Sequence, residues 1–117
     1  MTALKRGDVV LVFFPNSDLQ TFKRRPAVVV QSDQLDSKLP QVIIAMVTSN
    51  LDRRDHPSRV FVPLNSAEAG TAGFRTDSII MTDNVATVLL KAVAAKLGNM
   101  SSMSRIDEAL KFSLGLT

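Results

Sequence analysis

The segment Val9-Val10-Leu11-Val12-Phe13-Phe14 decides the fold class of this chain. It is a continuous apolar run of β-branched and aromatic residues ending at a proline, which is typical of a buried strand. Ala27-Val28-Val29-Val30 is likewise apolar and rich in β-branched residues, and it comes directly after Pro26. We therefore predict a hairpin whose two strands are joined by a polar loop over residues 16–25, with Asn16-Ser17-Asp18 as turn residues. A connection of that length is often functional.

Three further segments resemble strands. They are residues 41–47, residues 59–64, and residues 77–81 continuing towards Val85 and Val88. Residues 67–73 are small and are expected to be a flexible connection. Five short strands separated by turn residues indicate a mainly β fold, either a small antiparallel barrel or a strongly curved sheet.

The C-terminal part of the chain has helical spacing. Ser101 or Ser102 can cap a helix, and Gly115 is a suitable stop. One apolar face would then be formed by Met103, Ile106, Leu110 and Leu114. Residues 89–98 also favour a helix by propensity. The expected class is thus α+β, with the helical part at the C-terminal end.

Length and composition exclude several classes of protein. The 117 residues fit one domain, and 45% hydrophobic with 21% charged residues indicates a globular chain. Without cysteine, disulfide frameworks, thiolate metal sites and cysteine nucleophiles are excluded, and one histidine excludes a site that needs two imidazoles. The chain has no apolar run near ~18 residues and no signal-peptide core at its start. We therefore expect no membrane association and a cytoplasmic location.

The excess positive charge lies at the N-terminal end. Formal net charge is +3, and all of this excess falls within residues 1–25. Three of these charges are consecutive, at Lys23, Arg24 and Arg25. Such a patch favours a polyanion, either nucleic acid or an acidic protein segment, although a solvated turn would give the same charge pattern.

Few side chains could carry chemistry. The carboxylates are scattered, and phosphate-loop and nucleophile-elbow motifs are missing, so we expect no metal and no cofactor. His56 is the one conventional neutral-pH base, or else a solvated loop residue. Arg25, at the edge of a strand, could stabilise charge on a phosphate, and Thr48 and Ser49 offer hydroxyl donors. This set suits metal-free RNA cleavage by the 2′-hydroxyl. The alternative is a surface salt bridge at Arg25 and a strand end at Thr48.

The chain resembles the MazF/PemK family of toxin endoribonucleases of type II toxin-antitoxin systems over nearly its whole length. The matching pieces, in order, are Lys5-Arg6-Gly7-Asp8-Val9, Arg25-Pro26-Ala27-Val28-Val29-Val30-Gln31-Ser32-Asp33, Val47-Thr48-Ser49, Asp77-Ser78-Ile79-Ile80 with Thr87, Ile106-Asp107-Glu108-Ala109-Leu110, and Leu114-Gly115-Leu116. No single piece is decisive, but six in the same order over a chain of family length are specific.

The resemblance implies a small SH3-like antiparallel β-barrel with a C-terminal helix, a single toxin domain over residues 1–117, and a homodimer. It implies sequence-specific, metal-independent cleavage of single-stranded RNA, such as mRNA, and neutralisation by an antitoxin with an acidic C-terminal tail. Arg25 becomes the main catalytic residue and Thr48 its partner. RNA-binding positions are then Phe22, Lys23, Arg24, Ser49, His56, Asp83 and Asn84. Residues 16–24 fall where the family has a gate loop. Residues 92–98 fall where it has a short strand, and we expect the strand there rather than a helix, because sheet pairing often overrides propensity.

Several positions depart from the family pattern or leave alternatives open. The gate loop lacks glycine, Ala86 replaces a frequent arginine, and Met81 stands where one branch has an arginine. Phe22 could stack on a base or fold back into the core. Strand alternation predicts that Arg24 points away from Arg25. Asp83 is one possible base for the 2′-hydroxyl, beside Arg25 or a water. Besides an endoribonuclease, a non-catalytic or decayed module and a gyrase poison share this fold.

Overall fold

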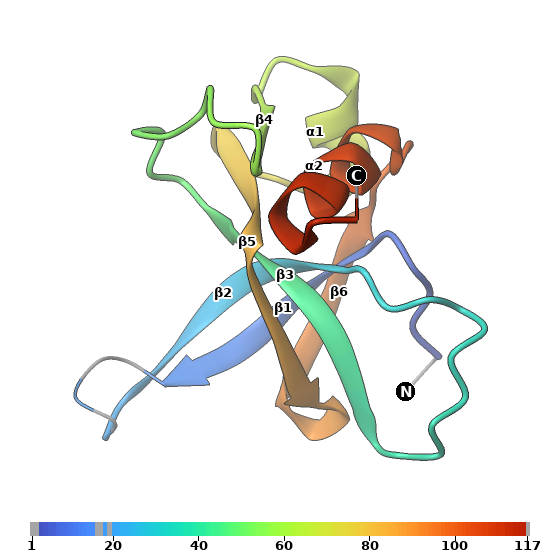
Figure 1. Ribbon diagram of the computed structural model, residues 1–117. Helices are drawn as coiled ribbons and strands as arrows, with labels where there is room; N and C mark the ends of the chain where they lie inside the picture. Colours follow the sequence, from blue (N-terminus) through green and yellow to red (C-terminus); the bar gives the residue numbers. More distant parts are fainter. Residues whose placement is uncertain (1–2, 16–17, 19, 117) are drawn as a thin grey trace.

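The computed structural model describes residues 3–15, 18 and 20–116, which form a six-stranded antiparallel sheet with two α-helices (Figure 1). The elements are β1 (Asp8–Pro15), β2 (Phe22–Val29), β3 (Gln41–Thr48), β4 (Arg59–Val62), α1 (Ala67–Ala72), β5 (Ser78–Leu89), a 3₁₀ turn η1 (Leu90–Ala92), β6 (Val93–Asn99) and α2 (Ser104–Leu114). Strand order is β4-β5-β3-β2-β1-β6. Within the described ranges β4 and β6 do not pair, so the curved sheet is barrel-like without closing. The mainly β fold with a C-terminal helix is confirmed.

Both faces of the sheet carry a hydrophobic core. Val9, Val28 and Ile80 lie in one cluster with Ile106 of α2, whereas Val10 and Val12 lie in a second cluster with Ile44. Val9 and Val10 therefore enter different cores, which explains why β1 has consecutive apolar residues rather than a simple alternation. Each fully buried valine or isoleucine of this kind contributes about 1.5–3 kcal/mol.

Residues 93–99 form β6, which confirms the strand that the family resemblance implies over residues 92–98. This strand pairs with β1 from Asp8–Asn99 to Val12–Val93, so sheet pairing overrides helical propensity there. One local prediction from composition, a flexible connection over residues 67–73, was wrong. Residues 67–72 are helical, because the Ser66 hydroxyl accepts a hydrogen bond from the Ala69 N–H and Gly73 ends the helix at φ 81°. A side chain on Gly98 would clash with the Thr71 carbonyl, so α1 lies directly on β6.

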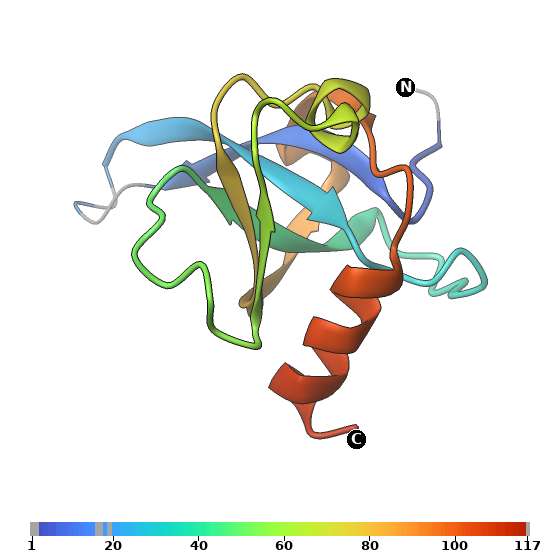
Figure 2. The same ribbon diagram turned by 90° about the horizontal axis from the view of Figure 1, so that it is seen from above.

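The terminal helix α2 contacts β5 and β4 and runs out towards the C-terminus, apart from α1 (Figure 2). Ile106 is buried, and Met103 and Leu110 pack against the same core, as predicted. The predicted stop at Gly115 is also confirmed, at φ 69°. The helix begins later than predicted, with Met103 and not Ser101 or Ser102 at the N-cap, and Leu114 is 58% exposed.

Candidate active site

The hairpin β1–β2 is longer and its connection shorter than predicted. Residues 22–25 are part of β2, because they pair with β1 from Pro15–Phe22 to Val12–Arg25, so they are not in a loop. Within the connection, the Gln20 and Thr21 N–H groups and the Thr21 hydroxyl donate to Asp18 and lower the pKa of its carboxyl. The other predicted turn residues, Asn16 and Ser17, and Leu19 of the gate loop lie outside the described residues.

Strand alternation divides the basic cluster between two faces of the hairpin. Arg25 pairs with buried Val12, whereas the Arg24 guanidinium lies 5.2 Å from the centroid of Phe13 on the opposite face. Successive residues of a strand point to opposite faces. Lys23 therefore lies on the same face as Arg25, and Phe22 lies on the same face as Arg24. Phe22 is 66% exposed, so it does not fold back into the core. The three consecutive cations therefore do not line one surface.

Arg25 and Thr48 come from neighbouring strands. The β2–β3 ladder ends at the pair Ala27–Met46, and Arg25 and Thr48 each lie two residues beyond that pair, so strand alternation puts both on the face of Ala27 and Met46. Thr48 is half-buried at the end of β3, where its Oγ1 accepts a hydrogen bond of 3.0 Å from the Asn50 N–H. That bond turns the chain away from the sheet. Ser49 is exposed beyond the strand.

A polar hollow of about 230 Å³ opens beside Thr48. It is lined by Thr48, Asn50, Asp52, Arg53, Arg59 and Met81. Two arginines that the sequence analysis did not single out, Arg53 and Arg59, thus line the hollow. Arg54 follows Arg53, and its guanidinium lies 5.8 Å from the centroid of Phe61. The charge of the segment before Pro57 was a sequence signal for Arg53 and Arg54, whereas Arg59 begins the predicted strand 59–64 and had none.

An irregularity in β5 contains Asp83, which contacts Arg59 on the wall of this hollow, and Asn84. The β3–β5 register jumps from Ala45–Val85 to Met46–Met81, which leaves residues 82–84 outside the ladder. The Thr82 hydroxyl donates to the buried Ser58 carbonyl at 2.7 Å and so anchors this bulge. Asn84 is exposed. We refer to residues 82–84 as the β5 bulge.

Asp83 in the β5 bulge is bound to Arg59. Arg59 Nη2 donates to Asp83 Oδ2 at 3.1 Å, and Nε lies 3.0 Å from Oδ1. Burial alone would raise the pKa of Asp83, but the hydrogen bond and charge of Arg59 outweigh it and hold the pKa below its ordinary value. A carboxylate with a lowered pKa is a weak base, and both of its oxygens face the guanidinium. This arrangement disfavours Asp83 as the base for a 2′-hydroxyl.

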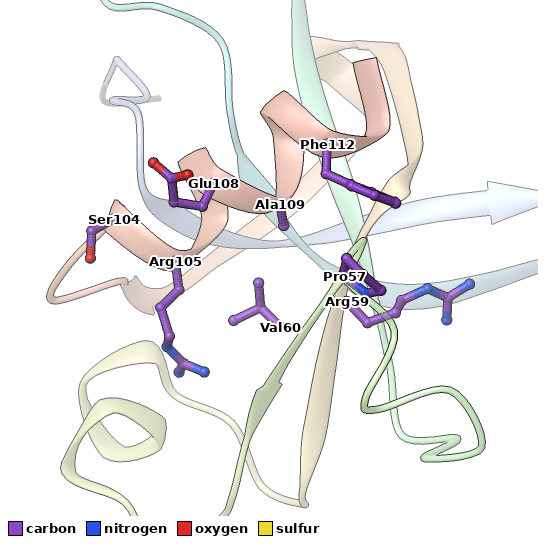
Figure 3. A pocket seen from close by; sticks show the side chains of 8 residues that line it. All are labelled: Pro57, Arg59, Val60, Ser104, Arg105, Glu108, Ala109 and Phe112. Atoms are coloured by element: carbon purple, nitrogen blue, oxygen red, sulfur yellow. The ribbon is translucent and has the colours of Figure 1, made fainter. Parts of the chain in front are cut away.

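His56 lies on the α2 side of the site region. Its Nδ1 is 2.7 Å from Ser58 Oγ and accepts from the Ser58 N–H at 3.2 Å, and its ring meets Phe112 edge-on at 5.8 Å. The adjoining groove, about 410 Å³, runs between α2 and residues 57–60 (Figure 3). His56 does not line the hollow beside Thr48. Arg59 borders both spaces.

The described part of the chain contains no group of three or more histidine, aspartate or glutamate side chains placed to hold a metal ion. None of its helices is long and apolar enough to span a membrane. The arrangement offers arginine donors, a threonine hydroxyl and neutral amide groups, which together recognise and stabilise an anion such as a phosphodiester.

Comparison with known proteins gives the family of this chain. Residues 5–114 match the family described as PemK-like, MazF-like toxin of type II toxin-antitoxin system. Endoribonuclease EndoA of Bacillus subtilis (strain 168) is 28% identical over 116 residues, which cover 97% of this chain and 96% of EndoA.

Two solved structures have the same fold. An endoribonuclease in complex with its cognate antitoxin, from a mycobacterial species, superposes with a TM-score of 0.74 at 22% identity, covering 98% of both chains. MazE-MazF (Form-II) from Deinococcus radiodurans gives 0.73 at 19% identity over the full length of both chains. From the sequence match over nearly all its length and the shared fold, we conclude that this chain belongs to the PemK-like, MazF-like toxin family of type II toxin-antitoxin systems.

Proposed function

We propose that this toxin is a sequence-specific endoribonuclease that cleaves single-stranded RNA, such as mRNA, without a metal or other cofactor. The observation that carries the proposal is the end of the β2–β3 ladder at Ala27–Met46, because Arg25 and Thr48 each lie two residues beyond this pair on the same face of the sheet. A hollow with Arg53 and Arg59 on its wall adjoins Thr48. EndoA, a relative of nearly the same length, is named an endoribonuclease.

In the proposed reaction the substrate supplies its own nucleophile. The 2′-oxygen forms a bond to phosphorus while the bond from phosphorus to the 5′-oxygen breaks. The 2′-hydroxyl loses its proton and the leaving 5′-oxygen gains one, giving a 2′,3′-cyclic phosphate and a 5′-hydroxyl. Arg25 stabilises the charge that develops on the non-bridging oxygens, because a guanidinium matches phosphate geometry. Thr48 positions the same phosphate through its hydroxyl. The Arg25 guanidinium is already protonated and cannot accept a proton, so a water takes the 2′-proton and a second water supplies the proton that the 5′-oxygen gains.

RNA would bind along the Arg25 face, with Lys23, Ser49, Asp83 and Asn84 at its borders. His56 would contact a base from the α2 side, and Phe22 with Arg24 would engage RNA from the opposite face of the hairpin. Within one protomer these RNA-binding residues lie on opposite faces of the hairpin. One RNA strand could therefore contact residues of both kinds only if two protomers form a homodimer. We propose this dimer as the active form in the cytoplasm.

The proposed inhibitor is a cognate antitoxin with a disordered, acidic C-terminal tail. One of the solved relatives is an endoribonuclease in complex with its cognate antitoxin. Arginines arranged for phosphates also bind carboxylates, so an acidic segment that orders on binding can occupy the same cations. Inhibition would then be direct competition with RNA.

Incubation of the purified protein with a long RNA in EDTA tests the proposed reaction. We expect discrete cuts with 2′,3′-cyclic or 3′-phosphate and 5′-hydroxyl ends. A substrate with a single 2′-deoxy nucleotide at the cut site should be inert, and the matching all-DNA strand should stay intact. Cutting of DNA would refute the mechanism. An intact RNA would favour a non-catalytic module, and a supercoiling assay with gyrase would then test the remaining alternative.

A further inference from the structure

Arg59 is held in a fixed orientation at the wall of the hollow. Its side chain is only 16% exposed, and Nε and Nη2 both lie within 3.1 Å of the Asp83 carboxylate. The β5 bulge carries Asp83, and the buried Thr82 hydroxyl fixes that bulge to the Ser58 carbonyl. The guanidinium is therefore oriented before any ligand arrives, so binding costs little side-chain entropy.

The register places Arg59 on the face of the sheet that carries Thr48. Arg59 pairs with Met81, Met81 with Met46, and Thr48 lies two residues beyond Met46 on the same strand. Arg59 and Thr48 both line the hollow. In Figure 3 the Arg59 side chain starts beside Pro57 and extends away from Ser104 and Arg105, and Arg59 lines the α2 groove as well as the hollow.

One edge of this guanidinium is available to a ligand. Nη2 donates to Asp83, Nε lies 3.0 Å from the same carboxylate without a hydrogen bond, and no described residue accepts a hydrogen bond from Nη1. An arginine has five N–H donors in a rigid fork, so a guanidinium bound to a carboxylate on one side can still donate to a phosphate on the other.

We propose that Arg59 is a second phosphate-binding residue of this site and that Asp83 is its positioning residue. The inferred ligand is a non-bridging oxygen of an RNA phosphodiester, held beside the phosphate that Arg25 and Thr48 engage. This inference rests on the proposed function. It gives Asp83 a role that does not require proton transfer, since the carboxylate orients Arg59.

The alternative is an ion pair that only stabilises the fold. Strand β4 is already paired with β5 from Arg59–Met81 to Val62–Ser78, and Val60 and Val62 are buried in the core under the helices. These contacts fix the strand without the ion pair. A partly exposed ion pair contributes on the order of 0–1 kcal/mol. A role in stability alone therefore explains little of why the charged groups converge at the hollow.

The experiment compares Arg59→Ala and Arg59→Lys with the matched control Arg105→Ala. Arg105 also forms an arginine–carboxylate pair, with Glu68 at 2.6 Å, but it does not line the hollow. Binding of an RNA oligonucleotide that is 2′-deoxy at the cut site is measured at several salt concentrations, and cleavage of the all-ribose RNA is measured in parallel.

Loss of one phosphate contact should reduce the slope of log affinity against log salt by roughly 0.7 for a single strand. We expect this for Arg59→Ala, with kcat/KM lowered about 10- to 100-fold. Arg59→Lys should keep the slope, because the positive charge remains. It should lose part of kcat/KM, because an ammonium group lacks the planar guanidinium that binds a phosphate through two N–H groups. Arg105→Ala should leave both values unchanged. An unchanged slope with kcat/KM within twofold for Arg59→Ala overturns the proposal, as does an equal change in the control.

The role of Asp83 is tested by a double-mutant cycle. Asp83→Asn should lower kcat by about tenfold while RNA affinity stays the same or rises, because a negative charge leaves the site. Adding Asp83→Asn to Arg59→Ala should cause no further loss. A further loss in the double variant would assign Asp83 an independent part in the reaction. The wild-type protein could bind RNA with a salt dependence that decreases in Arg59→Ala and yet cleave no RNA. In that case the proposed function fails, while the phosphate contact of Arg59 is supported.

Discussion

Arg24 and Arg25 are consecutive residues of β2 that face opposite sides of the sheet. The Arg24 guanidinium lies over Phe13, whereas Arg25 pairs with Val12 and lies on the face of Thr48. Two substitutions that remove the same charge one residue apart should therefore have different consequences.

Arg25→Ala is expected to lower the rate of RNA cleavage by roughly 10²–10³-fold, because it removes the cation facing the scissile phosphate. Arg24→Ala removes an equal charge from the other face and should cost only a few-fold, mainly in KM. Cleavage kinetics on one RNA oligonucleotide, with circular dichroism to confirm folding, give the comparison. Near-normal cleavage by Arg25→Ala would show that the catalytic assignment is wrong.

Thr48→Ala should reduce cleavage less than Arg25→Ala, since a neutral hydroxyl positions a phosphate without neutralising charge. Its Oγ1 also accepts the Asn50 N–H, so Thr48→Ser, which keeps that acceptor, is the matched control. We expect Thr48→Ser to retain most of the activity. A loss at Thr48→Ala equal to or larger than that at Arg25→Ala would reverse the ranking.

Phe22→Ala should weaken binding of uncleavable RNA with almost no change in Tm. The ring is 66% exposed, so little buried apolar area is lost, while an aromatic face that a base could stack upon disappears. Stacking of this kind contributes about 1–3 kcal/mol per base. Fluorescence anisotropy and thermal unfolding measure the two effects, and a fall in Tm without a change in RNA affinity would contradict the interpretation.

The pair Asp83–Arg59 predicts an acid-dependent contribution to stability. The pKa of folded Asp83 lies below its unfolded value near 3.8. The contribution is therefore fully present above the unfolded pKa and is lost as pH falls through the folded pKa. Urea unfolding between pH 7 and pH 3 should show Asp83→Asn less stable than wild type at pH 7, with the difference shrinking in the acid range. A constant difference would contradict the assignment of the lowered pKa to Asp83.

An acidic antitoxin tail should compete with RNA, and its affinity should fall as salt rises, because both ligands use the same cations. Titration of the cognate tail against labelled, uncleavable RNA at two salt concentrations checks this. Lys23→Glu together with Arg25→Glu should weaken both ligands. Simultaneous binding of tail and RNA would rule out a shared surface.

The sequence was sufficient for most of the strands and for the helix at the C-terminal end, because continuous apolar runs and helical spacing are local signals. Residues 93–99 could not be assigned by propensity, since β1 supplies their hydrogen-bond partners. The helix at 67–72 was missed because alanine and glycine carry little pattern, although Ser66 was a usable N-cap signal.

Less of the candidate site could be predicted. Alternation correctly separates Arg24 from Arg25 once residues 22–25 are known to be extended. Arg59 was not foreseeable, because its approach to Thr48 depends on two strand registers and on the β5 bulge, all of which join residues distant in sequence.

The β5 bulge also affects how such a site can evolve. Asp83 and Asn84 are outside the ladder, while the Thr82 hydroxyl anchors the segment to the Ser58 carbonyl and the Asp83–Arg59 ion pair contributes on the order of 0–1 kcal/mol. Substitutions at positions 83 and 84 can therefore change what the site contacts without breaking strand pairing. Selection for a new RNA sequence or a new antitoxin can act there while the two cores remain intact, so recognition and fold stability can diverge separately.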